Sequence, residues 1–286
     1  MHRIAVGIFA VWTLAGPLWA GSPEWDQAYE LYQRTEYQKA LEVLRAAPDK
    51  DAETLQLLGH NYFMLADYNK AGEMFEKALA LAPQKSALHH WMGRAWGRRA
   101  ETSSVFTAAG YASKARQSLE KAVQLDPNNQ EAANDLFEYY LQAPGFLGGG
   151  IQRAEALARH IAGLDAAEGH FAQAQIDDKR KEYKGAEEHL RRAAALAPKQ
   201  VGRVIDLAKY LANRNRWNES DAIFSEASRI APDSPAVLFA RAETYVRQKR
   251  NLASARQLLE RYLRSNLTPD DPPRERAEGL LKQISK

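Results

Sequence analysis

Apolar and small residues recur along this chain at the spacing of amphipathic helices that come in pairs. In the most regular stretch, a first helical face is followed by the face of a second helix, and the residues are Leu55, Leu58, Gly59 and Tyr62, then Ala71, Phe75 and Ala78. Gly59 and Ala71 are small and twelve positions apart, so two antiparallel helices can approach closely where they cross. Pro83 ends this unit. The pattern predicts a helical hairpin.

The same frame of aromatic, small and proline positions returns later in the chain. One further copy consists of Trp217, Ser220, Phe224, Ala227 and Pro232. The prolines that close two successive copies, Pro198 and Pro232, are 34 residues apart. A single hairpin of this size cannot bury its apolar face alone, so neighbouring hairpins must stack on one another. The 34-residue spacing argues against the alternative of a plain helical bundle without a groove.

In these positions the chain resembles the tetratricopeptide repeat family, most completely between Ala52 and Gln84. The resemblance covers residues 23–286 and implies an all-α fold, an open, right-handed superhelical solenoid of antiparallel helix pairs with about seven units plus a C-terminal capping helix. The expected units are 23–48, 52–85, 86–129, 130–166, 167–200, 201–234 and 235–264, and the expected capping helix is 273–284.

Two units depart from the repeated frame. Between Gly93 and Ala115 the spacing is 22 instead of twelve, and we expect the extra residues to lengthen the first helix and to add a turn near Ser103. The next unit contains Pro144 and the glycines of segment 148–150, which interrupt a helix. We expect a loop there.

In the family that the chain resembles, the first helix of each unit lines the concave wall. The helical phase then places seven candidate contact residues on that wall, namely Trp25, Tyr29, Tyr32, His60, His90, Arg94 and Arg98. Aromatic side chains and arginines are residue types that anchor protein interfaces. The alternative is structural: the aromatic residues cover the first core layer, and the two arginines are solvated or pair with acids such as Glu101.

Arginine binds planar carboxylates through paired hydrogen bonds. Arg94 with His90 therefore predicts a protein or peptide partner that presents an acidic side chain or a C-terminal carboxylate. The family's clamp for chaperone tails uses lysine, asparagine and arginine, whereas the corresponding positions here hold Gln56, His60 and Arg94. That specific clamp does not carry over.

Residues 1–20 have the order of a secretory signal peptide, with Arg3 near the start, an apolar stretch over 4–14 and the small Ala20 at the end. A membrane anchor is the alternative, but Pro17 interrupts a stretch shorter than the roughly 20 residues that a span needs. We expect cleavage after Ala20 and an exported, periplasmic protein without a membrane span.

The amino-acid composition limits the kinds of chemistry that the chain can perform. The chain has no cysteine, which excludes disulfides and thiol catalysis, and its net charge of +3 lacks the basic concentration of a nucleic-acid binder. Seven histidines show no metal-ligand spacing, and the glycines of 148–150 are not followed by the Lys-Ser or Lys-Thr of a phosphate loop. We predict no catalytic residue, no metal, no cofactor and no enzymatic activity.

These observations predict a non-catalytic scaffold of the bacterial cell envelope that binds a polypeptide partner in its concave groove. Two alternatives stay open. One is a small-ligand or enzymatic site built from the 99–114 insertion and the 145–150 glycine loop, because irregular inserts on a rigid scaffold often carry function. The other is a self-associating structural spacer.

Overall fold

The computed structural model describes residues 22–48 and 50–285, so the expected signal peptide lies outside the described residues. The first half contains α1 (Pro23–Gln33), α2 (Tyr37–Ala46), α3 (Ala52–Met64), α4 (Tyr68–Leu81), α5 (Ser86–Thr102), α6 (Val105–Leu125), α7 (Gln130–Gln142) and the 3-10 helix η1 (Gly145–Leu147). The second half contains α8 (Ile151–Leu164), α9 (Ala166–Lys179), α10 (Tyr183–Leu196), α11 (Val201–Asn213), α12 (Trp217–Ile230), α13 (Pro235–Arg247), α14 (Leu252–Arg264) and α15 (Arg274–Ile284).

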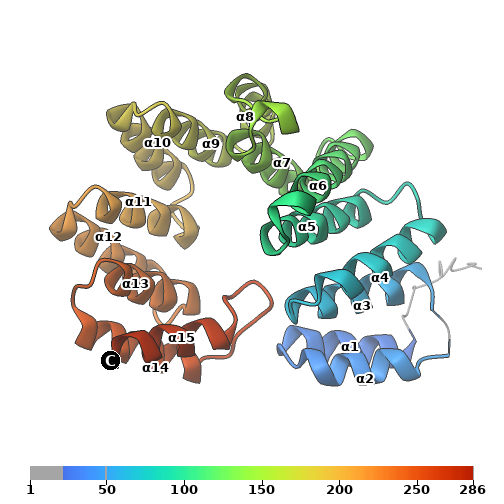
Figure 1. The fold of residues 1–286 in the computed structure, drawn as a ribbon. Helices are drawn as coiled ribbons and strands as arrows, with labels where there is room; N and C mark the ends of the chain where they lie inside the picture. The colour runs from blue at the N-terminus through green and yellow to red at the C-terminus, as the bar shows by residue number, and fades with distance from the viewer. Residues whose placement is uncertain (1–21, 49, 286) are drawn as a thin grey trace, which may run out of the picture.

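The all-α solenoid predicted from the sequence is confirmed. Consecutive helices pair from α1 with α2 to α13 with α14, and α15 packs on α13 and α14 at the end of the stack. Figure 1 shows that the pairs wind around a common centre, with the first helix of most pairs on the inner side. The inner wall is therefore built mainly from α3, α5, α7, α9 and α11.

The repeat is visible in the backbone as well as in the side chains. Within three successive pairs, the residue that ends the turn has a positive φ, namely Lys181 at 66°, Asn215 at 60° and Lys249 at 52°. A left-handed residue at this place ends the first helix and lets the chain fold back. The next amide then closes the turn, as when Glu182 N donates to Asp177 O at 2.8 Å.

Small residues let the two helices of a pair approach closely. A Cβ on Gly59 would lie 2.5 Å from Cε1 of Phe75, whose side chain is fully buried. In the sixth pair, Ser220 Oγ donates to the backbone oxygen of Ala208 at 2.8 Å across the same twelve-residue spacing. The crossing inferred from the sequence is therefore the place where the helices of a pair touch.

The third pair is longer than the others. Helix α5 has 17 residues and α6 has 21, whereas the flanking helices α4 and α7 have 14 and 13. The expected lengthening of the first helix and the expected turn near Ser103 are both present, and α6 is lengthened as well, because it begins at Val105, well before Ala115. Helix formation on both sides satisfies more backbone groups than a long loop would.

The glycine segment folds tightly against the end of α7. Gly150 N donates to the backbone oxygen of Tyr140 at 2.7 Å, and Tyr139 Oη donates to that of Leu147 at 2.9 Å. A Cβ on Gly149 would lie 1.8 Å from the backbone oxygen of Ala143, so only glycine fits there. The expected loop is thus a fixed wall that contains η1.

The two ends of the solenoid come together, which the expected open superhelix did not include. The segment between α14 and α15 reaches the turn between α1 and α2, as Figure 1 shows. Residues 35–39 and 64–66 line one cavity of about 650 Å³ together with parts of 267–275. Small rotations at each stacking step add up over seven pairs, and this accumulation brings the ends together.

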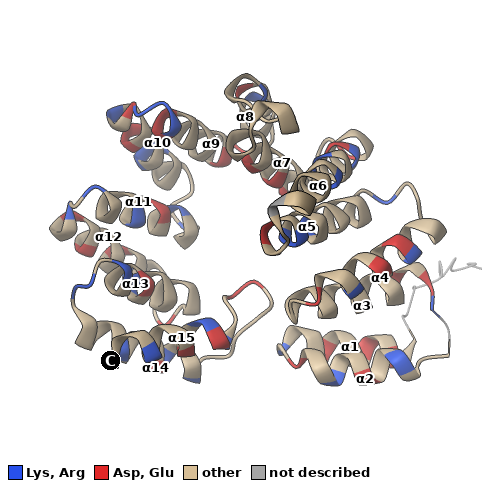
Figure 2. Ribbon diagram, viewed as in Figure 1, with Lys and Arg blue, Asp and Glu red and all other residues tan. Residues whose placement is uncertain are grey.

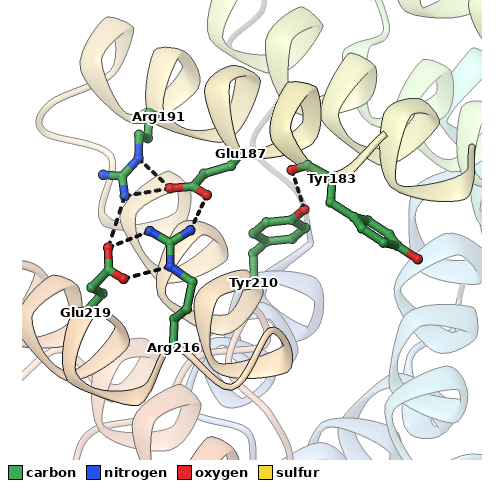
Figure 3. A network of polar contacts seen from close by, with 6 residues as sticks. All are labelled: Tyr183, Glu187, Arg191, Tyr210, Arg216 and Glu219. Atoms are coloured by element: carbon green, nitrogen blue, oxygen red, sulfur yellow. Dashed lines mark hydrogen bonds and ion pairs between the residues drawn. The ribbon is translucent and has the colours of Figure 1, made fainter. Parts of the chain in front are cut away.

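Ion pairs link neighbouring pairs on the outer side. Figure 3 shows Arg216 bonded to both Glu187 of α10 and Glu219 of α12, and Arg191 Nη2 lies 2.7 Å from Glu187. Tyr210 Oη also donates to the backbone oxygen of Tyr183 at 2.8 Å. Exposed pairs of this kind contribute only about 0.2–1 kcal/mol each. They fix how α10 and α12 lie relative to each other more than they stabilise the fold.

Charge is distributed without a one-sided face. Figure 2 shows lysine and arginine interspersed with aspartate and glutamate along the superhelix. Across residues 22–48 and 50–285, no helix is both long enough and apolar enough to cross a membrane.

The crossing of α3 and α4 generates a stability prediction. Replacing Phe75 with alanine should lower the free energy of unfolding by about 3–5 kcal/mol, because a fully buried ring leaves a cavity. Gly59→Leu should lower it by about 1–3 kcal/mol, because the new side chain overlaps the ring. Urea unfolding followed by circular dichroism measures both. Gly72→Leu is the matched control, because an added Cβ meets nothing there; equal effects at Gly59 and Gly72 would refute the crossing.

Candidate functional site

An aromatic ladder runs along the inner wall of the first three pairs. The rings of Trp25 and Tyr29 stack at 5.0 Å with planes 8° apart, and Tyr29 continues to Tyr32 at 6.4 Å. The ladder crosses to the second pair through Tyr32 and His60, whose rings are 5.9 Å apart. It ends at Trp91 of α5, 4.2 Å from His60. Four predicted contact residues thus belong to one continuous surface.

The ladder is only partly open to solvent. Tyr29 is 41% exposed, and Trp25 and His60 are half-buried, whereas Tyr32 is buried. The structural interpretation therefore applies to Tyr32, which covers the first core layer. The functional interpretation applies to Tyr29, which remains available to a partner.

Arg94 is held in place by its neighbours. Its guanidinium lies 4.2 Å from the ring centre of Trp91 and 5.3 Å from that of Phe63. Nε of Arg94 is 3.7 Å from Oδ2 of Asp135, which lies on α7. Cation–π contact and an opposite charge both favour this fixed position.

His90 does not face the groove, contrary to the prediction. Its side chain is 2% exposed, and its Nε2 lies 2.7 Å from Oδ2 of Asp135. The side of a helix on which a residue lies can be assigned from the sequence only to within about one position, and at His90 the assignment was off by about that much. The neighbouring Trp91 is half-buried and contacts His60, Phe63 and Arg94, whereas His90 lies in the contact between α5 and α7.

Arg98 is also engaged within the protein. Its guanidinium forms an ion pair with Glu101, and its Nε donates to Tyr68 Oη at 3.3 Å. The same guanidinium lies 5.5 Å from the Tyr68 ring centre. The structural alternative, in which the arginines pair with acids such as Glu101, therefore describes Arg98 correctly.

Two cavities adjoin each other along the inner helices. The first, of about 470 Å³, lies among α5, α6, α7 and the glycine segment, and the second, of about 250 Å³, lies among α7, α9, α10 and α11. Gln142 lines both cavities, so they lie next to each other along the inner wall, and we call the pair the groove. Inner-wall residues of the second cavity include Phe171, Gln175, Lys209, Tyr210 and Asn213.

Sequence reasoning missed three contributors to this surface: Trp91, Tyr68 and Asp135. Trp91 is next to His90 and could have been found from the sequence, because it lies three residues before Arg94 on the same side of the helix. Tyr68 opens a second helix, which the phase argument assigned to the core. Asp135 is 45 residues from His90, and no local pattern reveals that the two side chains bond.

The titratable groups of the ladder are not poised for acid or base chemistry. Burial and the charges of Arg94, Lys85 and His90 lower the pKa of His60 to about 3, so it is neutral near pH 7. Burial, with the charge of Asp270 second, raises the pKa of Tyr32 to about 12. Over the part of the chain that the structure describes, no group of three or more His, Cys, Asp or Glu side chains is placed to hold a metal ion.

The lowered pKa of His60 predicts a pH dependence of stability. An unfolded histidine takes up a proton near pH 6.5, whereas the folded one does so only near pH 3, so acid favours the unfolded chain within this window. The free energy of unfolding should therefore fall by about 1 kcal/mol from this group between pH 7 and pH 5.5. His60→Gln should remove that part of the slope in urea titrations. An identical slope in both proteins would show that His60 is not kept neutral.

Comparisons with known proteins agree with this architecture. The family model of the tetratricopeptide repeat matches residues 52–85 and 103–129. No curated protein matches the sequence significantly.

Solved structures share the fold at low identity. A thermophilic TPR protein of Thermus thermophilus is 21% identical, with a TM-score of 0.54 over 66% of this chain and 97% of that chain. A tetratricopeptide repeat protein from Parabacteroides merdae is 15% identical, with a TM-score of 0.58 over 92% and 98%. The human IFIT1 dimer with PPP-AAAA is 19% identical, with a TM-score of 0.55 over 84% of this chain and 54% of that chain. The chain thus contains tetratricopeptide repeats at residues 52–85 and 103–129, within a fold of stacked helical hairpins that it shares with these solved structures.

Proposed function

We propose that this protein is a non-catalytic scaffold of the bacterial cell envelope that binds a polypeptide along its concave groove. The tetratricopeptide repeat fold in general supports protein interaction scaffolds. The observation that carries the proposal is the row of two neighbouring cavities along the inner wall, one at α5 and α6 and one at α9 and α11, with Gln142 lining both. An elongated ligand such as an extended peptide fits a surface of this shape better than a compact one.

Two exposed aromatic side chains are further candidate anchors, one of them next to the first cavity. Phe146 of η1 is 84% exposed, between Pro144 and Leu147, which line the first cavity. Phe106 at the start of α6 is 97% exposed. An exposed aromatic ring offers a partner a large apolar area to bury. Both lie in the two segments that depart from the regular repeat.

The charged groups of the groove support binding more than catalysis. Arg94 and Arg98 face Asp135 and Glu101, and His60 lies among the rings of Tyr32, Phe75 and Trp91. A general base needs a lone pair within reach of substrate and a pKa near the working pH. His60 does not meet the second requirement, since its pKa is about 3.

Site-specific photocrosslinking tests the groove. A photoreactive phenylalanine analogue at Gln142, which lines both cavities, should yield adducts with a polypeptide in cells of the native host. The matched control is the same analogue at Glu226, an exposed residue of the outer helix α12. Gel electrophoresis and mass spectrometry identify the adducts. Equal adducts at both positions, or none at Gln142, would contradict a partner in the groove.

Export is tested separately. With residues 1–20 acting as a signal peptide, the periplasmic fraction of a Gram-negative host should contain a chain that begins at Gly21. Ala20→Arg should block this cleavage, because the position before the cut requires a small residue. Mass spectrometry of the intact protein measures the outcome. A full-length chain that stays in the cytoplasm would refute export, and an uncleaved chain in the membrane would favour an anchor.

A further inference from the structure

The cavity between the third and fourth pairs exists because both departures from the repeat meet there. The extended α5 and α6 supply one side of the cavity, and Ala143, Pro144 and Leu147 line another side. Arg116 of α6 packs against Gly148, where a Cβ would lie 2.8 Å from its Nε, and this contact fixes the glycine segment to the third pair. The cavity is therefore bounded on several sides by ordered backbone.

The interior of this cavity is apolar and contains small residues. Its lining includes Gly97, Ala100, Ala112, Ala115, Leu119 and Leu147. A Cβ added to Gly97 would meet no atom within 4 Å, so the missing side chain leaves room in the cavity. In contrast, a Cβ on Gly93 would lie 2.7 Å from Leu119, so that glycine serves helix packing. The space beside Gly97 is available to an aliphatic chain.

The charged groups around the cavity leave one negative charge without a partner. Arg94 is paired with Asp135 and Arg98 with Glu101. Glu138, one turn after Asp135 on α7, also lines the cavity. Among residues 22–48 and 50–285, the structure shows no hydrogen bond or ion pair to the Glu138 carboxylate. Two arginines thus face three acids.

The surroundings of Glu138 favour a positive ligand. Glu138 is exposed to solvent on the cavity side of α7, and the protein around its carboxyl, followed by the negative charges of Asp135 and Glu101, raises its pKa above the usual range. A cation placed beside this carboxylate would relieve the repulsion, whereas an anion would add to it. An anion would also have to compete with carboxylates already bound to both arginines.

We propose that this cavity binds a lysine or arginine side chain of the bound polypeptide, with its aliphatic stem beside Gly97 and its cationic group on Glu138. The inference rests on the proposed function and refines it, and it reverses the acidic partner expected from Arg94 in the sequence. Long basic side chains suit such a site because they bury an apolar stem while a charge remains at the tip. A lysine and an arginine share this chemistry.

Selection of peptides on the purified protein tests the proposal. Random twelve-residue peptides displayed on phage should yield binders with a basic residue at one shared position. Replacing that residue with norleucine in the synthetic peptide should weaken binding at least ten-fold, measured as Kd by fluorescence anisotropy. Glu138→Gln should weaken binding of the parent peptide to a similar degree. The two changes together should weaken it little further, because both remove one contact.

Matched variants separate charge from shape. Gly97→Leu should abolish binding by filling the cavity, whereas Gly110→Leu should not, since an added Cβ there also meets nothing and Gly110 is not part of the lining. Glu226→Gln, on the outer helix α12, is the control for loss of a negative charge. Glu138→Lys should restore binding to a peptide in which the basic residue is replaced by glutamate. Circular dichroism checks that each variant is folded.

Several outcomes would overturn the proposal in distinguishable ways. Peptides that are sensitive to Gly97→Leu but carry no basic residue, or that ignore Glu138→Gln, would refute the basic pocket while the polypeptide groove stands. Peptides rich in acid that require Arg94 would restore the expectation from the sequence. If no peptide binds but spermidine does so with dependence on Glu138, the cavity is a small-cation site, and both this inference and the proposed function fail.

Discussion

The architecture depends on how closely the two helices of each pair approach at one crossing. Gly59 has no Cβ to hold the Phe75 ring away, and Gly93 leaves the same space for Leu119. Where the second small residue is Ser220, its hydroxyl reaches the backbone of the opposite helix. Similar crossings give the hairpins similar thickness, so each one stacks on the next with a comparable rotation. The accumulated rotation brings the last segment back to the first pair.

The first cavity of the groove arises where this regularity is broken. Lengthening α5 and α6 extends the third pair past its neighbours, and a continuous helix after α7 would leave that extension without a partner. The glycine segment supplies that partner, because only a glycine at position 149 can lie so close to Ala143. The two irregular segments therefore form the first cavity together, although 30 or more residues separate them in the sequence. The regular pairs supply a rigid frame, and the irregular ones supply a cavity.

Much of the fold could be predicted from the sequence because its determinants are local. Helical period, small residues at the crossing and closing prolines all lie within a single hairpin. The assignment of residues to one side of a helix has an error of about one position, however. At α5 this error led to the prediction of His90 instead of its neighbour Trp91. The approach of the two chain ends could not be predicted, because it sums small rotations that no single unit encodes.

The sign of the charge that the groove presents to a ligand also could not be predicted from one helix alone. Three basic residues at helical spacing on α5 indicate an anion site only if the facing helix is neutral. The facing helix α7 instead supplies Asp135 and Glu138, and the end of α5 itself supplies Glu101. Each wall of a repeat groove is shared by neighbouring units, so ligand preference follows from the sum of charges over two helices. A basic stripe on one helix can thus serve mainly to hold the acids of the next in position, leaving the unpaired acid to meet the ligand.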